Sequence, residues 1–270
     1  REYTDLEDLI SHSYPYVKDH EKVADCIEQI KDYAEDSIPV LQEDGTIAGI
    51  ITSQDIVEAV DDEMGEDYAK LAGLTAEEDL NEKLTESVKK RLPWLVILLF
   101  LGMVVSSVVG AFEAVVAVIP IVMCFQSLIL DMAGNVGTQS LAVTIRVLMD
   151  ESLTARQKLE LVWKEMRIGL CNGGLLGVLA LLFIGLYVWL FKGKSIHYAF
   201  CLSGCVGVSL LLSMVISSFV GTAIPMFFKK IKVDPAVASG PLITTVNDLV
   251  AVVTYYSLSW LMLVEVFHLT

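Results

Sequence analysis

The sequence lacks the short motifs that mark the common classes of enzyme. It contains no HExxH, no GxSxG and no GxxxxGK[ST] pattern, and its 4 histidines are scattered without metal-ligand spacing. No apolar run occurs before Leu92, so these residues are not expected to include a signal peptide. Residue 1 is Arg rather than Met, and we expect that an N-terminal part precedes it. The sequence predicts no enzymatic activity.

Basic residues are scarce. The chain of 270 residues has 19 Lys and Arg against 34 Asp and Glu, which gives a net charge of −15. Residues 1–93 hold 9 of the basic and 25 of the acidic residues. So negative a chain repels phosphate backbones, and no basic, aromatic-rich stripe offsets this, so we expect no nucleic-acid partner. Divalent cations are the expected partners.

Cysteines are few, and their spacing matches no disulfide framework or zinc motif. The 5 cysteines form no CxxC pair, and all except Cys26 lie in apolar stretches. We interpret them as small buried hydrophobic side chains in a reducing compartment. Cys201 and Cys205 share a helix face, but they have no His or carboxylate at ligand spacing, so we assign no metal to them.

Apolar residues dominate the chain after Arg91. The mean hydropathy is +0.59, and 54% of the residues are hydrophobic. Five apolar stretches follow one another: 93–111, 115–148, 168–191, 199–228 and 235–266. The third stretch would be about 36 Å long as a helix, enough to cross a hydrocarbon core of about 30 Å. The fold class expected is a mainly α-helical membrane protein with five transmembrane helices, preceded by a small α/β unit and a connecting helix.

The distribution of basic residues predicts the orientation in the lipid bilayer. Basic residues precede the first span, as in Lys89 and Arg91, and they also lie between the second and third spans and between the fourth and fifth. All these groups fall on one side of the membrane, and the other side has only Lys192 and Lys194. Because Lys and Arg accumulate in cytoplasmic loops, we expect a cytoplasmic N-terminus and an external C-terminus.

Residues 1–60 are expected to form a small cytosolic α/β unit. Apolar residues repeat at helical spacing over 23–34, and a second helix is expected from Ile56. Between them, the segments 37–41 and 47–52 flank a turn and are predicted strands. The acidic segment 61–92 is expected to be a helix that connects this unit to the transmembrane domain, residues 93–270.

The fifth apolar stretch contains a carboxylate, Asp248. An ionised carboxylate at mid-bilayer costs about 2.5–3.5 kcal/mol, so such acids face water, an ion or a partner group. Gly240, Thr244 and Asp248 are spaced four apart and share one helical face, where small and hydroxyl side chains let water approach. An alternative is that Asp248 only pairs with an Arg or Lys inside the helix bundle, but no span has a basic residue at similar depth.

The second apolar stretch carries a matching polar face. Asp131, Asn135 and Gln139 are four apart, and Gly134 and Gly137 permit close backbone approach. We interpret the two faces as the lining of one ion path. The alternative is that these side chains only join helices by hydrogen bonds, with Asp131 near the cytoplasmic end. The first stretch ends near Glu113, which either attracts cations at an entrance or is simply solvated.

The acidic residues of the soluble part suggest a second cation site. Neighbouring carboxylates repel one another over a compact unit, and hydrated Mg²⁺ bridges loosely arranged carboxylates. The residues with which we associate regulatory Mg²⁺ are Asp55, Glu58, Asp61, Asp62, Glu66 and Asp67. The alternative is an ordinary solvated acidic surface.

The sequence resembles the MgtE family of magnesium channels over nearly its whole length. The motifs that carry the resemblance are AGNVGTQS at 133–140 and DPAVASGPLITTVND at 234–248, with RLPW at 91–94 and YAKLAG at 68–73. The soluble part, through SIPV at 37–40 and DGTIAGIIT at 44–52, is similar to a CBS repeat. Family members usually have two such repeats and a preceding acidic domain, whereas one repeat is present here.

The resemblance implies a homodimer in a prokaryotic plasma membrane, with a central pore for hydrated Mg²⁺. Asp248, the Thr244 carbonyl and the Asn135 amide would line the pore, and cytoplasmic Mg²⁺ would close it. CBS pairs often hold adenine nucleotides, so Thr52 and Asp55 are candidate contacts for one. The alternatives are a cation exchanger that couples Mg²⁺ to Na⁺ or H⁺, and a membrane-anchored CBS sensor without transport.

Overall fold

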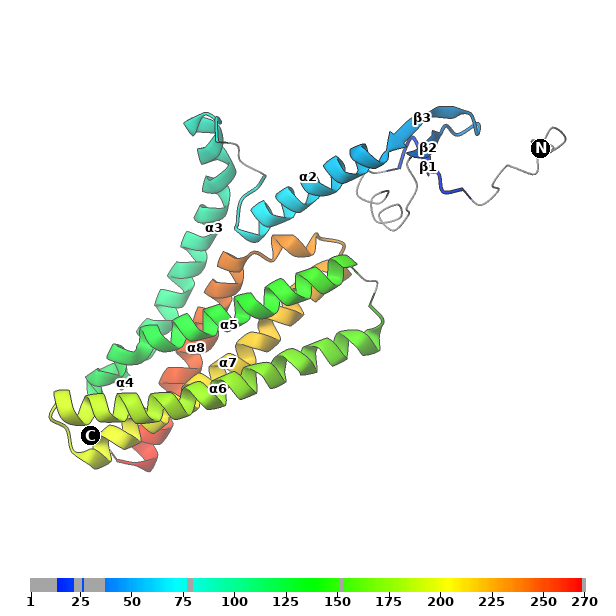
Figure 1. Ribbon diagram of the computed structural model, residues 1–270. Helices are drawn as coiled ribbons and strands as arrows, with labels where there is room; N and C mark the ends of the chain where they lie inside the picture. Colours follow the sequence, from blue (N-terminus) through cyan, green and yellow to red (C-terminus); the bar gives the residue numbers. More distant parts are fainter. Residues whose placement is uncertain (1–13, 22–25, 27–36, 77–79, 151–152, 269–270) are drawn as a thin grey trace, which may run out of the picture. The chain divides into compact units, whose positions relative to one another are not determined.

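The computed structural model describes residues 14–21, 26, 37–76, 80–150 and 153–268 (Figure 1). Contacts within the chain divide it into two compact units, Arg1–Tyr68 and Ala69–Thr270. The helix predicted over 23–34 lies outside the described residues except for Cys26, which is helical and buried.

The first unit is built on a three-stranded sheet in the order β1-β2-β3. The strands are β1 (Val17–Lys18), β2 (Ser37–Leu41) and β3 (Ile47–Thr52), so the two predicted strands are confirmed. β2 pairs antiparallel with β3 and parallel with β1. The strand β1 was not predicted from the sequence. The β2–β3 turn is held by Asp44, which accepts hydrogen bonds from the Thr46 amide and hydroxyl. These hydrogen bonds lower the pKa of Asp44.

The predicted connecting helix over 61–92 is divided in the structure. Its first part completes α2 (Ser53–Leu71), a loop follows, and α3 (Leu84–Ala111) begins well before the first apolar stretch. The break falls at Gly73, which has a φ of +85°. A Cβ at this glycine would lie 2.5 Å from the Trp94 ring. Both the backbone conformation and the ring therefore require glycine, and the helical pattern could not continue through it.

The second unit is helical, and five of its helical segments are long and apolar enough to cross a membrane. These segments are Leu84–Ala111, Pro120–Leu148, Ala155–Phe191, Ile196–Lys230 and Gly240–Val266, so each of the five predicted spans corresponds to a helical segment of sufficient length. The elements after α3 are α4 (Glu113–Val118), η2 (Pro120–Val122), α5 (Met123–Asp150), α6 (Ala155–Phe191), α7 (Ile196–Lys230), η3 (Pro235–Val237), α8 (Gly240–Leu258) and η4 (Ser259–Val266). Pro120 separates α4 from α5, so the predicted second span is not one helix from its start.

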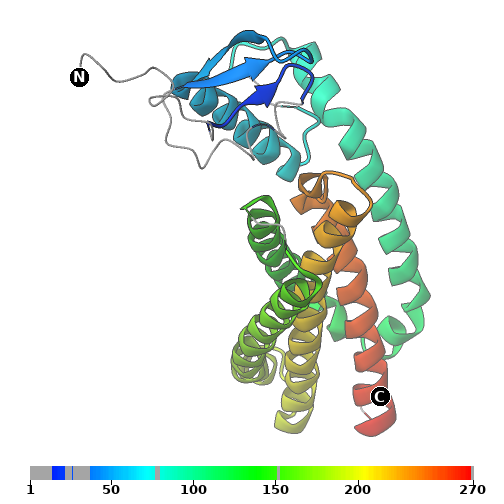
Figure 2. The ribbon, with the colours of Figure 1, turned by 90° about the vertical axis from the view of Figure 1, so that its right-hand side faces the viewer.

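Glycines allow α6 and α7 to pack closely along their length. A Cβ on Gly177 would lie 2.8 Å from the Gly207 carbonyl oxygen, and one on Gly207 would lie 2.7 Å from that of Gly177. The backbones therefore touch at this crossing, as in membrane helix pairs with small residues at the interface. Figures 1 and 2 show α3 along α8, which it contacts, and no residue of α3 is buried.

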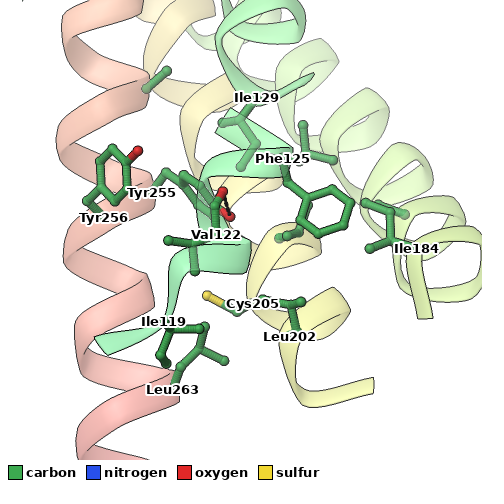
Figure 3. Close-up of a cluster of buried hydrophobic side chains, with 14 of the residues drawn as sticks. Ile119, Val122, Phe125, Ile129, Ile184, Leu202, Cys205, Tyr255, Tyr256 and Leu263 are labelled. Carbon is green, nitrogen blue, oxygen red and sulfur yellow. Dashed lines mark hydrogen bonds between the residues drawn. The ribbon is translucent and has the colours of Figure 1, made fainter. Parts of the chain in front are cut away.

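A hydrophobic core joins α4, α5, α6, α7 and α8 near the end of the second unit that contains η2 (Figure 3). Tyr255 and Tyr256 are fully buried in it, and the Tyr255 hydroxyl donates a hydrogen bond of 2.8 Å to the Val122 carbonyl oxygen. This bond satisfies a polar group that would otherwise be buried without a partner. The core fixes α8 against α5, the two helices that carry the predicted polar faces.

The cysteine prediction is partly wrong. Cys26 and Cys205 are buried, as expected, and Cys201 is intermediate. Cys124 and Cys171, however, are exposed. Both lie on outward faces of long apolar helices, where an apolar pattern does not distinguish packing within the bundle from exposure to lipid.

Candidate functional site

The polar stripe of α5 lies on an open face of the helix. Asp131, Asn135 and Gln139 are all exposed, and the Asn135 amide donates a hydrogen bond of 3.2 Å to the Asp131 carboxylate. Asp131 is about 12 Å from the start of α5 at 1.5 Å per residue, well inside the helix. Polar side chains at this depth are costly against acyl chains, so this face requires water, an ion or another protein surface.

Glycines bring the second polar helix, α8, against α5. A Cβ on Gly134 would lie 3.0 Å from Thr244 Cγ2, and a Cβ on Gly137 would overlap the side chain of Asn247. The hydroxyls of Thr138 and Thr244 face each other across the contact at 3.5 Å. The two helices therefore meet beside the predicted α5 face, whose Asp131, Asn135 and Gln139 stay exposed, and the contact is within one turn of both Asn135 and Asp248.

Asp248 is half-buried in the second unit. It forms no ion pair with any Lys, Arg or His of the residues that the structure describes. Its position is about 12 Å from the first residue of α8, in a helical segment of 27 residues. The alternative in which Asp248 only neutralises a basic side chain has no support among these residues.

Thr244 and Gly240 lie one and two turns before Asp248 on α8. The Thr244 hydroxyl donates to the Gly240 carbonyl oxygen at 3.0 Å, so it is occupied within its own helix. The Thr244 carbonyl lies in a regular helix, where it accepts the amide of the residue four positions on and keeps a second lone pair. A water molecule bound to a hydrated ion could therefore donate a hydrogen bond to this carbonyl oxygen.

Asn247 is a residue of this site that the sequence patterns did not indicate. Its side chain is fully buried against Gly137, and neither amide atom has a hydrogen-bond partner in the described part of the chain. Buried amides are normally satisfied, so this position is unusual. Periodicity gave no signal for it, because Asn247 lies next to Asp248 but on a different face of α8.

The end of α2 is anchored to the start of α8. Lys70 forms an ion pair of 2.8 Å with Asp234, which precedes η3 and caps it through the Ala236 amide. The Trp94 indole donates a hydrogen bond of 2.9 Å to Ser239, the N-cap of α8. Lys70 of α2 and Trp94 of α3 therefore both contact the segment 234–239 that precedes Gly240, two turns from Asp248.

The acidic residues expected to bind regulatory Mg²⁺ are spread along α2 rather than gathered. The described residues contain no group of three or more His, Cys, Asp or Glu that could hold a metal ion. Glu58, Asp61, Asp62 and Glu66 are exposed, and Asp67 is intermediate. These carboxylates do not form an ion site within the described part of one chain.

Thr52 and Asp55 bind each other at the start of α2. The Asp55 carboxylate accepts hydrogen bonds from the Thr52 amide at 2.8 Å and hydroxyl at 2.7 Å. These bonds lower the pKa of Asp55. The pair thus has a capping role at the first turn of α2. Asp55 also lines a cavity of about 170 Å³ that includes Lys18 and Ile51.

Comparison with known proteins agrees with the motifs in the sequence. A family model described as MgtE, divalent cation transporter, matches residues 126–258, which include both polar faces, and a CBS domain model matches residues 6–62. The chain is 37% identical over 235 residues to a protein from Enterococcus faecalis named magnesium transporter MgtE, an alignment that covers 87% of this chain and 50% of that protein. The chain belongs to the MgtE family.

Two further relatives carry the same name. The magnesium transporter MgtE of Bacillus subtilis is 35% identical over 243 residues, which cover 90% of this chain and 51% of that protein. The one of Thermus thermophilus is 30% identical over 263 residues, which cover 96% of this chain and 56% of that protein. The chain thus spans about half the length of the MgtE relatives that it matches.

Proposed function

We propose that two copies of the chain form a pore that conducts hydrated Mg²⁺ across the membrane. The observation that carries the proposal is the open polar face formed by Asp131, Asn135 and Gln139 next to the unpaired Asp248. Such a face cannot be left against lipid at low cost, and a second copy related by a two-fold axis would enclose it. The relatives are named magnesium transporters, which supports the choice of ion.

Asp248 has the charge and the position required of the central ion ligand. Two symmetry-related carboxylates would place a charge of −2 at the axis, which suits a divalent cation. Mg²⁺ gives up its water reluctantly and is commonly held by one or two carboxylates while it keeps several waters. The Thr244 carbonyl and the Asn135 amide would contact the hydrated ion, with Gly240, Gln139 and Asp131 lining the path beyond them.

The proposed orientation and driving force of transport both come from the sequence. The basic loops would place the N-terminus in the cytoplasm and the C-terminus outside a prokaryotic plasma membrane. The 270 residues of the sequence contain no motif for nucleotide hydrolysis. We therefore propose that the Mg²⁺ concentration gradient and the membrane potential drive the ion. A channel of this kind reverses its current at the Nernst potential of Mg²⁺. An exchanger coupled to Na⁺ or H⁺ reverses elsewhere, and a sensor carries no flux at all.

The acidic helix α2 is the proposed regulator. Without bound cations, the carboxylates Asp61, Asp62 and Glu66 of two copies would repel one another and favour an open state. Mg²⁺ that binds only the closed arrangement would stabilise it by RT ln(1 + [L]/Kd) for each site. The Lys70–Asp234 pair, which joins the end of α2 to the segment before α8, supports a mechanical route from α2 to α8.

An adenine nucleotide is a further proposed ligand of the first unit. The cavity lined by Asp55 has a volume of about 170 Å³, smaller than the pockets of about 300–1,000 Å³ that enclose drug-sized ligands. It would therefore form one half of a nucleotide site, and a second CBS repeat would supply the other half.

Two experiments test the proposal. Asp248→Ala should abolish Mg²⁺ uptake while the protein still purifies as a dimer, and growth of a magnesium-dependent strain on this variant would show that Asp248 is not the ligand. Neutralising Asp61, Asp62 and Glu66 together should leave conduction intact and weaken inhibition by cytoplasmic Mg²⁺. Unchanged inhibition would remove these residues from the gate.

A further inference from the structure

The outward side of α6 has a basic, aromatic hollow near the N-terminal end of the helix, which begins at Ala155. The hollow has a volume of about 880 Å³, and all of its lining side chains come from α6. They include the basic residues Lys164 and Arg167 and the side chains of Trp163 and Ile168, of which Trp163 is 55% exposed. The opposite side of α6 packs on α7, so the hollow faces away from the helices of its own chain.

The length of α6 places this hollow at the surface of the bilayer. The helix has 37 residues and is about 55 Å long, so it extends well beyond a hydrocarbon core of about 30 Å. Its far end has an interfacial pair, in which Lys192 Nζ lies 5.7 Å from the centre of the Tyr187 ring. About 30 Å back along the helix from Tyr187 is Arg167. Trp163, Lys164 and Arg167 therefore lie at the level of the lipid headgroups.

The charges in the hollow are available to an anion. Arg156, at its outer edge, is paired with Glu160 at 2.9 Å. Lys164 and Arg167 form no ion pair with the described residues, and they are three positions apart, so their side chains are neighbours on the helix surface. A phosphate group between them would accept hydrogen bonds from both, and Arg binds phosphate with two parallel bonds.

We propose that this hollow binds the headgroup of an acidic phospholipid. The phosphate would lie between Lys164 and Arg167, the Trp163 ring would lie beside the glycerol region, and an acyl chain would run along Ile168 into the hydrocarbon. A second copy of the chain that met this face across a two-fold axis would oppose like charges, which disfavours a protein occupant. The proposal requires only that α6 spans a membrane, and it is independent of ion transport.

The test uses the tryptophan in the hollow as a probe. The full chain with Trp94→Phe, Trp189→Phe and Trp260→Phe retains Trp163 as its single tryptophan and is placed in phosphatidylcholine vesicles. Brominated phosphatidylglycerol should quench Trp163 at least about twofold more than brominated phosphatidylcholine at equal mole fraction. This preference should decrease as NaCl is added, because salt screens the charges.

Two charge variants separate the hollow from a general effect of charge. Lys164→Gln with Arg167→Gln should abolish the preference for the acidic lipid. The matched control, Lys192→Gln with Lys194→Gln, removes two cations at the other end of α6 and should retain the preference. If the first double variant does not fold, the parent chain still tests the proposal. Its preference between the two brominated lipids, and the salt dependence of that preference, can be measured without any charge variant.

Four outcomes would overturn the proposal. Equal quenching by both lipids would show that the hollow does not select an acidic headgroup. A preference that survives Lys164→Gln with Arg167→Gln would place the lipid elsewhere. A Trp163 that no lipid quenches would show that a protein surface covers this face. A loss of the preference on adding inorganic phosphate that exceeds the loss caused by NaCl at the same ionic strength would identify a site for a soluble anion.

Discussion

The contact between α5 and α8 depends on the absence of a side chain at Gly137. In Gly137→Ala, the new Cβ would overlap the fully buried Asn247 side chain and would also lie 3.2 Å from Ile243 Cγ2. Overpacking of this kind costs about 1–3 kcal/mol, against a gain of about 1 kcal/mol from replacing glycine in a helix. We expect α8 to be displaced from α5, and with it Asp248, the neighbour of Asn247.

The matched control for this change is Gly174→Ala on α6, where a Cβ would have no heavy atom within 4 Å. Only the gain in helix propensity acts there, so the difference between the two variants measures the α5–α8 contact itself. Thermal unfolding in detergent should place Gly137→Ala below Gly174→Ala, and Mg²⁺ flux in proteoliposomes should fall only in the former. Equal unfolding temperatures with normal flux in both variants would refute the reasoning.

Three further predictions concern other parts of the chain. Lys70→Gln breaks the partly exposed ion pair with Asp234, which is worth at most about 1 kcal/mol, so the Mg²⁺ concentration that inhibits flux should rise by at most about fivefold; an unchanged value would exclude this pair from gating. Hydrogen bonds from Thr52 lower the pKa of Asp55 in the folded unit below its ordinary value of 3.8. They therefore contribute to the free energy of unfolding above pH 3.8, and this contribution is lost as the pH falls through the lower pKa of the folded unit. In Thr52→Val, the decline in the free energy of unfolding between about pH 5 and pH 3 should therefore be smaller, as chemical denaturation of the chain would show, and an identical decline would contradict this assignment. Tyr255→Phe leaves a buried carbonyl without its hydroxyl partner and should destabilise the second unit by about 1–3 kcal/mol in a thermal-shift assay, whereas an unchanged unfolding temperature would show that the bond contributes nothing.

Hydrophobic patterning predicted the elements whose signal is local. The strands Ser37–Leu41 and Ile47–Thr52 were predicted with their bounds, and so were the five membrane helices to within a few turns. The helix starts were less accurate, because polar turns such as 84–92 and 155–167 continue a helix without adding apolar residues. Apolar runs locate the part of a helix inside lipid, not the part beyond it.

The features that were missed depend on contacts distant in sequence. Helical spacing predicted that Asn135 and Asp248 lie on polar faces, and the glycines indicated where the helices approach. Spacing could not reveal the buried amide of Asn247, because its environment is made by Gly137 on another helix. The anchor between Lys70 and Asp234 joins residues 164 positions apart, and no periodic signal connects them.

The central claim is that the Asp248 carboxylate holds a hydrated divalent cation on its way across the membrane. Asp248→Asn preserves the shape of the side chain and removes its charge, and Glu86→Gln makes the same chemical change at an exposed residue in the first turn of α3, outside the polar faces. We expect Mg²⁺ flux into proteoliposomes to fall at least about tenfold in Asp248→Asn, a loss of about 1.4 kcal/mol or more, and to stay near the parent value in Glu86→Gln. Flux through Asp248→Asn equal to that of the parent chain would contradict the account.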